Sequence, residues 1–132
     1  MSEVFPIEAE ADIVTVRRHA KQLAQEHGFD AFAAAALTTA ASELARNVWT
    51  HGHGGVATIE ALTDDGRKGV RMEFRDEGPG IADLDRALAG GFSTARSLGL
   101  GLSGTRRLVD EFDVQTEVGH GTIVTVVKWA RR

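Results

Sequence analysis

The sequence predicts an α+β protein in which helices cover one face of a mixed, mostly antiparallel sheet, forming a two-layer α/β sandwich. Two observations lead to this class. Segments 12–27 and 30–50 repeat apolar residues at helical spacing. Segments 56–75 and 114–129 each alternate apolar and polar residues on either side of a glycine-containing turn, as β-hairpins do.

Length and composition indicate the number of domains, the cellular location and the kind of partner that we expect. Its 132 residues fit one domain, expected to span 1–132, and 42% apolar with 26% charged residues is ordinary for a soluble globular protein. No apolar run approaches the roughly 18 residues of a membrane span, and no signal-peptide pattern opens the chain. The lack of cysteine is compatible with the cytoplasmic location that we expect. A net charge of −4 argues against a nucleic-acid partner.

The first elements are a short strand and a helix. Residues Val4–Glu8 are apolar but contain Pro6, which suits an edge strand at most. Asp12 is the expected N-cap of a helix that runs to about His27, where Gly28 ends it.

The second helix is predicted over Asp30–Thr50. Glu43 and Asn47 are four residues apart and therefore stack on one face of it. Ala36 and Ala40 lie beside them, and such small side chains leave room for a ligand. The buried stripe is expected on a different face, formed by Leu37, Ala41, Leu44 and Val48.

The first hairpin consists of strands Val56–Thr63 and Gly69–Arg75 around a turn at 64–68. In the second strand Val70, Met72 and Phe74 alternate with charged residues, so one face is buried. Asp76 follows directly at the end of this strand.

Two further helices and a second hairpin complete the chain. Asp83 is expected to cap a short helix that reaches Leu88. A helix is predicted over 105–112, because Leu108 and Phe112 are four residues apart. Strands 114–118 and 122–129 form the second hairpin.

A glycine-rich run, Gly99-Leu100-Gly101-Leu102-Ser103-Gly104, stands before the helix predicted at 105–112. A glycine loop that opens a helix offers unpaired backbone N–H groups and the positive end of the helix dipole, which together bind phosphate. A dinucleotide-binding turn would need a hydrophobic strand directly before the glycines, but segment 93–98 lacks strand alternation. A Walker A loop would need a Gly-Lys-Ser/Thr ending, which is missing. The run therefore predicts a phosphate-binding loop of another kind.

Four segments now occur together in one order, and they are Glu43–Asn47, Asp76–Ile81, Gly99–Gly104 and Gly121-Thr122. Together they resemble the N, G1 and G2 boxes of the GHKL, or Bergerat-type, ATP-binding fold, and the resemblance covers the whole chain. Further likeness to the switch kinases of the RsbT type, which are serine/threonine kinases of bacterial partner-switching systems, comes from Ser42–Asn47, Gly91–Thr94, Arg107–Phe112 and Lys128-Trp129. The anti-sigma-factor kinases are related through the ATP boxes.

The resemblance implies ATP and Mg²⁺ as cofactors and assigns roles to residues. Asn47 would bind the metal, and Glu43 would accept the proton of the attacking serine hydroxyl or orient that hydroxyl. Asp76 would accept a hydrogen bond from the adenine amino group, supported by Thr122. The remaining residues implied in binding are Gly78, Gly80 and Ile81 around the base, Ser93 and Thr94 in a lid at 93–98, and Gly99, Leu100, Gly101, Leu102, Ser103 and Gly104 around the phosphates.

The function that the resemblance implies is phosphorylation of a STAS-domain antagonist by an ATP-dependent protein serine/threonine kinase. The kinase would then bind and activate a PP2C-type phosphatase, or the N-terminal regulatory domain of one. Two alternatives stay open, an anti-sigma-factor kinase that sequesters a sigma factor and a non-catalytic, ATP-bound binding switch. The sequence does not choose between Arg96, Arg106 and Arg107 as a phosphate contact, nor between a monomer and a homodimer.

Overall fold

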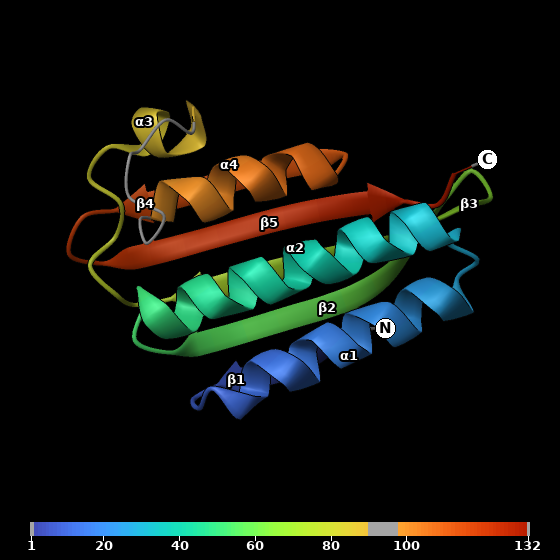
Figure 1. The fold of residues 1–132 in the computed structure, drawn as a ribbon, viewed down its shortest axis with the longest axis horizontal. Coiled ribbons are helices and arrows are strands. Elements are labelled where there is room, and N and C mark those ends of the chain that lie inside the picture. Colours follow the sequence, from blue (N-terminus) through green and yellow to red (C-terminus); the bar gives the residue numbers. More distant parts are fainter. Residues whose placement is uncertain (1, 90–97, 132) are drawn as a thin grey trace.

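The computed structural model describes residues 2–89 and 98–131 (Figure 1). The elements, in chain order, are β1 (Ser2–Ile7), α1 (Ala11–Glu26), α2 (Ala31–Thr50), β2 (Gly55–Asp64), β3 (Arg67–Asp76), α3 (Leu84–Ala89), α4 (Leu98–Leu108), β4 (Glu111–Glu117) and β5 (Gly121–Trp129). Both predicted hairpins and both long helices are therefore present.

The strands form one sheet in the order β1-β2-β3-β5-β4, and the helices lie side by side on one face of it (Figure 1). Within the described residues, all four neighbouring pairs of strands are antiparallel. The predicted α+β class with a two-layer sandwich is confirmed. No helix of the described segments has the length and apolar content needed to span a bilayer.

Strand β5 lies between β3 and β4, although β4 precedes it in the chain. This arrangement pairs Asp76, the last residue of β3, with Thr122 near the start of β5. On its other side Thr122 pairs with Thr116 of β4. Three strand ends thus meet at one end of the sheet.

The core lies between the sheet and helices α1, α2 and α4. Val70, Met72 and Phe74 of β3 are buried as predicted, with the charged residues between them on the other face. The stripe predicted for α2 is also confirmed, since none of its members is more than 3% exposed, and these members are Leu37, Ala41, Leu44 and Val48. At roughly 25 cal/mol per Å² of apolar surface removed from water, such burial is the main stabilising contribution.

Asp12 is not the N-cap of α1, and this prediction was wrong. Glu10 occupies the cap position without a side-chain hydrogen bond, and Asp12 lies in the first helical turn. The Asp12 carboxylate instead accepts hydrogen bonds from the backbone N–H groups of Glu8 and Ala9, at 2.8 and 2.9 Å. It therefore satisfies donors that precede the helix.

The helix predicted over 105–112 was wrong in its bounds. α4 begins at Leu98, includes the glycine-rich run and ends at Leu108, while Phe112 lies in β4. Leu102 and Thr105 are each 1% exposed, and their three-residue spacing defines a buried face that extends the helix upstream. The chain leaves the helix where the Asp110 N–H donates to the Val127 carbonyl at 2.9 Å, which starts the pairing of β4 with β5.

α2 begins at a side-chain cap. Asp30 has an extended backbone, and its Oδ1 accepts a hydrogen bond from the Ala33 N–H at 2.7 Å. This bond satisfies one of the amide groups that the first turn of a helix leaves unpaired.

We expect Asp30→Ala to lower the free energy of unfolding by about 1 kcal/mol, the usual effect of losing such a cap. Glu10→Ala is the matched control, because Glu10 caps α1 without a side-chain hydrogen bond. Urea unfolding of the two variants measures the difference. Equal stability of both would contradict the capping role of Asp30.

Candidate functional site

The predicted site residues come together at one end of the sheet. The last turns of α2, the end of β3 and the starts of β5 and α4 all lie at the left of Figure 1. Asn47 is in the last turns of α2, Asp76 ends β3 and Thr122 opens β5. Glu43 lies one turn before Asn47 on the same helix.

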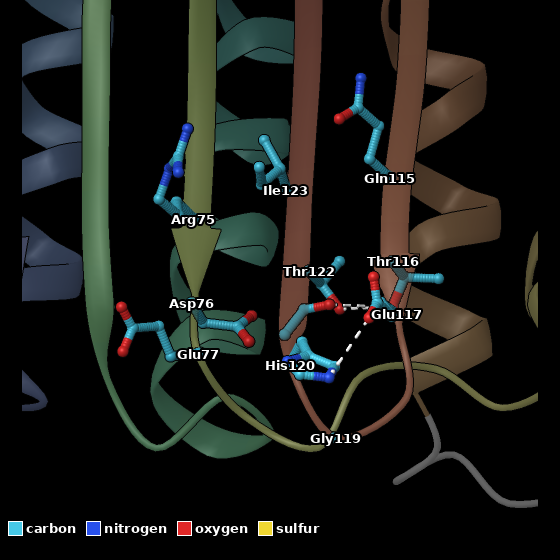
Figure 2. Close-up of a pocket in the computed structure, with 11 residues that line it drawn as sticks. Arg75, Asp76, Glu77, Gln115, Thr116, Glu117, Gly119, His120, Thr122 and Ile123 are labelled. Carbon is cyan, nitrogen blue, oxygen red and sulfur yellow. Dashed lines mark hydrogen bonds and ion pairs between the residues drawn. The ribbon is translucent and has the colours of Figure 1, made fainter.

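Asp76 provides a half-buried carboxylate at this end. It lies two residues after the buried Phe74, which places its side chain on the same, helix-covered face of β3, and Figure 2 shows it directed toward β5. Its Oδ1 accepts a hydrogen bond from the Gly78 N–H at 2.9 Å. Burial raises the pKa of Asp76, and the backbone N–H groups of Gly78 and Thr122 oppose that rise. The nearby His51 and His53 oppose it more weakly.

Gly52 joins Asn47 to Asp76, which sequence reasoning missed. Its N–H donates to the Asn47 carbonyl at 3.2 Å, just after the end of α2. A Cβ atom at Gly52 would overlap the carboxyl group of Asp76, so only glycine allows this close approach. The sequence signal is a glycine two residues after Thr50, the predicted end of the second helix.

His51, beside Gly52, is the second titratable group of this turn with a shifted pKa. Burial lowers the pKa of His51, while the Asp76 carboxylate opposes this effect and His53 adds to it. A lowered pKa keeps the imidazole neutral at pH 7, so Asp76 does not face a full positive charge there.

Asn47 has a buried polar atom at this end of the sheet. Its side-chain Nδ2 makes no hydrogen bond within the described residues. Amide oxygen and nitrogen are assigned from their surroundings, so the unpartnered position can hold either atom. The Glu43 side chain is half-buried, and no hydrogen bond or ion pair to it occurs among the described residues. The buried Nδ2 of Asn47 destabilises the fold unless a ligand supplies a hydrogen-bond partner for it.

The glycines after Asp76 serve contacts within the protein. A Cβ at Gly78 would lie 2.7 Å from the Gly52 Cα, and one at Gly80 would lie 2.5 Å from the Glu117 carbonyl oxygen. Gly80 also has a φ of +77°, which disfavours other residues. Protein backbone occupies the positions that a Cβ would take at these two glycines, and the approach of a base to their backbone stays a prediction. The Ile81 N–H is likewise used, donating to Thr116 Oγ1 at 2.9 Å.

The glycine-rich run is helical, so its predicted loop conformation is wrong. Gly99, Leu100 and Gly101 belong to the first turns of α4. Leu102 and Ser103 are buried on α4. A Cβ at Gly104 would meet nothing within 4 Å, so no close contact explains this glycine. The run still presents a helix N-terminus at the site end of the sheet.

The remaining predicted residues divide into two groups. Ser93, Thr94 and Arg96 lie outside the described residues. Arg106 and Arg107 are in the last turn of α4, roughly 12 Å from its start at 1.5 Å per residue. They suit the negative end of the helix dipole rather than a phosphate at its N-terminus.

Two hollows border Asp76. The larger, of about 580 Å³, spans the ends of β3, β4 and β5 and is lined by Thr116, Gly121 and Thr122, among others (Figure 2). The smaller, of about 390 Å³, is lined by residues of the 52–56 turn together with Arg75 and Glu77. Volumes of several hundred Å³ are typical of small-molecule sites. Arg75, on the face of the sheet opposite the helices, also lines the larger hollow.

Comparison with known proteins identifies the class. Residues 5–128 match the family of histidine kinase-like ATPase domains. The chain is 42% identical to the serine/threonine-protein kinase RsbT of Bacillus subtilis (strain 168), over 95% of this chain and 94% of that protein. It is 32% identical to the anti-sigma F factor of Thermoanaerobacter sp. (strain X514), over 70% of this chain and 68% of that protein. The mycobacterial sensor histidine kinase MprB has the same fold, with a TM-score of 0.56 at 16% identity and 99% of each chain covered.

The chain therefore belongs to the histidine kinase-like ATPase family, and the predicted resemblance to GHKL ATP-binding proteins is confirmed. Within this family, its 42% identity to a serine/threonine-protein kinase over 95% of the chain makes it an enzyme of the protein serine/threonine kinase type.

We expect Asp76→Asn to be at least as stable as the wild type near neutral pH. Asparagine keeps an oxygen for the Gly78 N–H and removes a desolvated charge. Burial raises the pKa of Asp76 in the folded state. The carboxyl group therefore stabilises the folded state at pH values below its ordinary pKa, and this stabilisation is lost as the pH rises through the raised pKa.

Urea unfolding at about pH 7 and about pH 4 tests this expectation, since the ordinary pKa of Asp is about 3.9. The stability difference between Asp76→Asn and the wild type should shrink at the lower pH. Asp113→Asn, at an exposed position on β4, is the control. A variant that is clearly less stable at pH 7 would contradict the burial effect.

Proposed function

We propose that this chain is an ATP-dependent kinase of a bacterial partner-switching pathway, which acts in the cytoplasm on a protein serine. The observation that carries the proposal is the buried Nδ2 of Asn47, which has no partner among the described residues, at the same end of the sheet as the half-buried carboxylate of Asp76. One group suits the phosphate end of a nucleotide and the other suits its base.

Asp76 is proposed to recognise adenine. Its carboxylate oxygens accept hydrogen bonds, and one of them is held in place by the Gly78 N–H. The exocyclic amino group of adenine is a donor that such an acceptor binds well. Thr122, directly opposite in β5, supplies a hydroxyl beside it.

Asn47 is proposed to hold Mg²⁺ through its side-chain oxygen. Mg²⁺ prefers oxygen ligands, and the buried amide position that lacks a partner in the described part of the chain suits such a ligand when the side-chain oxygen occupies it. When bound, the ion neutralises charge on the phosphates of ATP. The backbone N–H groups at the start of α4, including Gly99 and Gly101, are proposed to contact the phosphates.

Glu43 is proposed as the general base. The serine oxygen of the substrate attacks the γ-phosphorus of ATP, and the bond from this phosphorus to the β–γ bridging oxygen breaks, leaving ADP. The serine proton passes to the Glu43 carboxylate. Placement one helical turn from Asn47 supports this role, because it brings the base near the phosphate end.

We expect Glu43→Gln to lower the rate of phosphoryl transfer by roughly 10²- to 10⁴-fold, because the amide cannot accept the proton. ATP affinity should not change, since Glu43 does not contact the nucleotide in this mechanism. Transfer of labelled phosphate to a STAS-domain protein and ATP titration measure the two quantities. Glu8→Gln, at an exposed position before α1, is the matched control. Equal transfer rates would remove Glu43 from the base role.

We expect Asn47→Ala to abolish the dependence of ATP affinity on Mg²⁺. In the wild type, chelation of Mg²⁺ should weaken ATP binding, whereas the variant should bind ATP equally weakly with and without the metal. Its stability should not fall through a lost hydrogen bond of the amide nitrogen, because this atom has no partner within segments 2–89 and 98–131. Calorimetric titration with and without chelator measures this, and a variant that retains the full metal effect would exclude Asn47 as a ligand.

The proposed partners follow the switch-kinase relatives. The substrate would be a STAS-domain antagonist, and the second partner a PP2C-type phosphatase or its N-terminal regulatory domain. Phosphorylation of the antagonist would release the kinase, which then activates the phosphatase by binding. The match to a relative named as a serine/threonine-protein kinase supports the first step.

A second candidate function is sequestration of a sigma factor, supported by the match to an anti-sigma F factor. Incubation with labelled ATP and each candidate partner distinguishes the possibilities. Label on the antagonist, followed by co-purification with a phosphatase, supports the first function. Co-purification with a sigma factor supports the second, and a stable complex without label indicates a non-catalytic switch.

A further inference from the structure

One hydroxyl at the site end, that of Thr116, has no role in the mechanism above. The Thr116 hydroxyl of β4 lies 2.9 Å from the Ile81 backbone nitrogen, 2.9 Å from Thr122 Oγ1 and 3.2 Å from the Gly121 carbonyl oxygen. It therefore contacts the turn after Asp76 and the first two residues of β5. Figure 2 shows the Thr116–Thr122 contact on the wall of the larger hollow.

A count of hydrogens fixes the direction of these bonds. A hydroxyl has one hydrogen and two acceptor positions. Thr116 Oγ1 accepts from the Ile81 N–H, which uses one acceptor position. All three contacts become hydrogen bonds only if Thr116 donates to the Gly121 carbonyl and accepts the hydrogen of Thr122. Thr122 then has only acceptor positions left for a ligand.

We propose that Thr116 is a positioning residue that makes Thr122 a hydrogen-bond acceptor and thereby selects purines with a 6-amino group. The inference rests on the proposed ATP site and deepens it. Asp76 and Thr122, opposite each other in register, then present two acceptors to the two hydrogens of one amino group. A 6-oxo purine places an acceptor against these acceptors and is disfavoured.

The test compares ATP with inosine triphosphate, which carries an oxygen in place of the 6-amino group. Thr116→Val removes the acceptor, so the Thr122 hydrogen can turn toward the ligand and donate to that oxygen. The ratio of ATP to inosine triphosphate affinities should fall by roughly three- to tenfold, the range that one hydrogen bond contributes. The ratio is used because a general destabilisation of the fold would lower the affinities for both nucleotides alike.

Two controls accompany this measurement. Thr116→Ser keeps the hydroxyl and should restore the wild-type ratio. Thr125→Val removes a threonine hydroxyl of β5 from the face of the sheet opposite the helices, and should leave the ratio unchanged. An unchanged ratio in Thr116→Val overturns the inference.

A measurement on the unchanged protein applies if Thr116→Val does not fold. Slowly exchanging hydroxyl protons, observed by NMR, should place the Thr122 hydrogen between the two threonine oxygens. A Thr122 hydrogen that exchanges freely with water would overturn the inference. Failure of the wild type to bind ATP would instead reject the proposed function, so the two failures are distinguishable.

Discussion

The antiparallel pairing of β3 with β5 is the constraint on which the site depends. Its register places Thr122 opposite Asp76, and the pairing of β5 with β4 brings Thr116 beside Thr122. The same strand ends bring the turn after Asp76 against β4, where Gly80 approaches Glu117 closely. A slip of one residue would turn these side chains to the opposite face of the sheet. Register in this sheet is therefore a functional property as well as a structural one.

The site carries polar groups that the fold alone does not satisfy. Burial raises the pKa of Asp76, and the Asn47 amide nitrogen has no partner in the described part of the chain. Both features lower stability, and both become favourable when a ligand supplies the missing donor or charge. Gly52 lies between the two residues, because its N–H donates to the backbone carbonyl of Asn47 and its small size admits the Asp76 carboxyl group. Perturbed groups of this kind concentrate at functional sites.

Local patterns predicted most of the fold, because they decide which face of an element is buried. The alternation in β3 and the stripe on α2 both appear as expected. The position of β5 between β3 and β4 could not be predicted in this way, since pairing of distant strands leaves no local signal. The start of α4 was missed because glycines have low helix propensity, whereas burial of Leu102 and Thr105 decides the conformation. Asn47 and Asp76 were predicted because they lie in the segments that carry the family resemblance, whereas Gly52 and Thr116 lie outside those segments.

The most direct test of the account is the affinity of wild type and Asp76→Asn for ATP with Mg²⁺, measured by calorimetric titration. If the carboxylate of Asp76 accepts the adenine amino group, the variant should bind roughly 10- to 100-fold more weakly, as expected for a hydrogen bond to a charged group. Its unfolding transition, recorded on the same sample, shows that the fold is intact. Equal affinities of two folded proteins, or no binding of ATP by the wild type, would contradict the account.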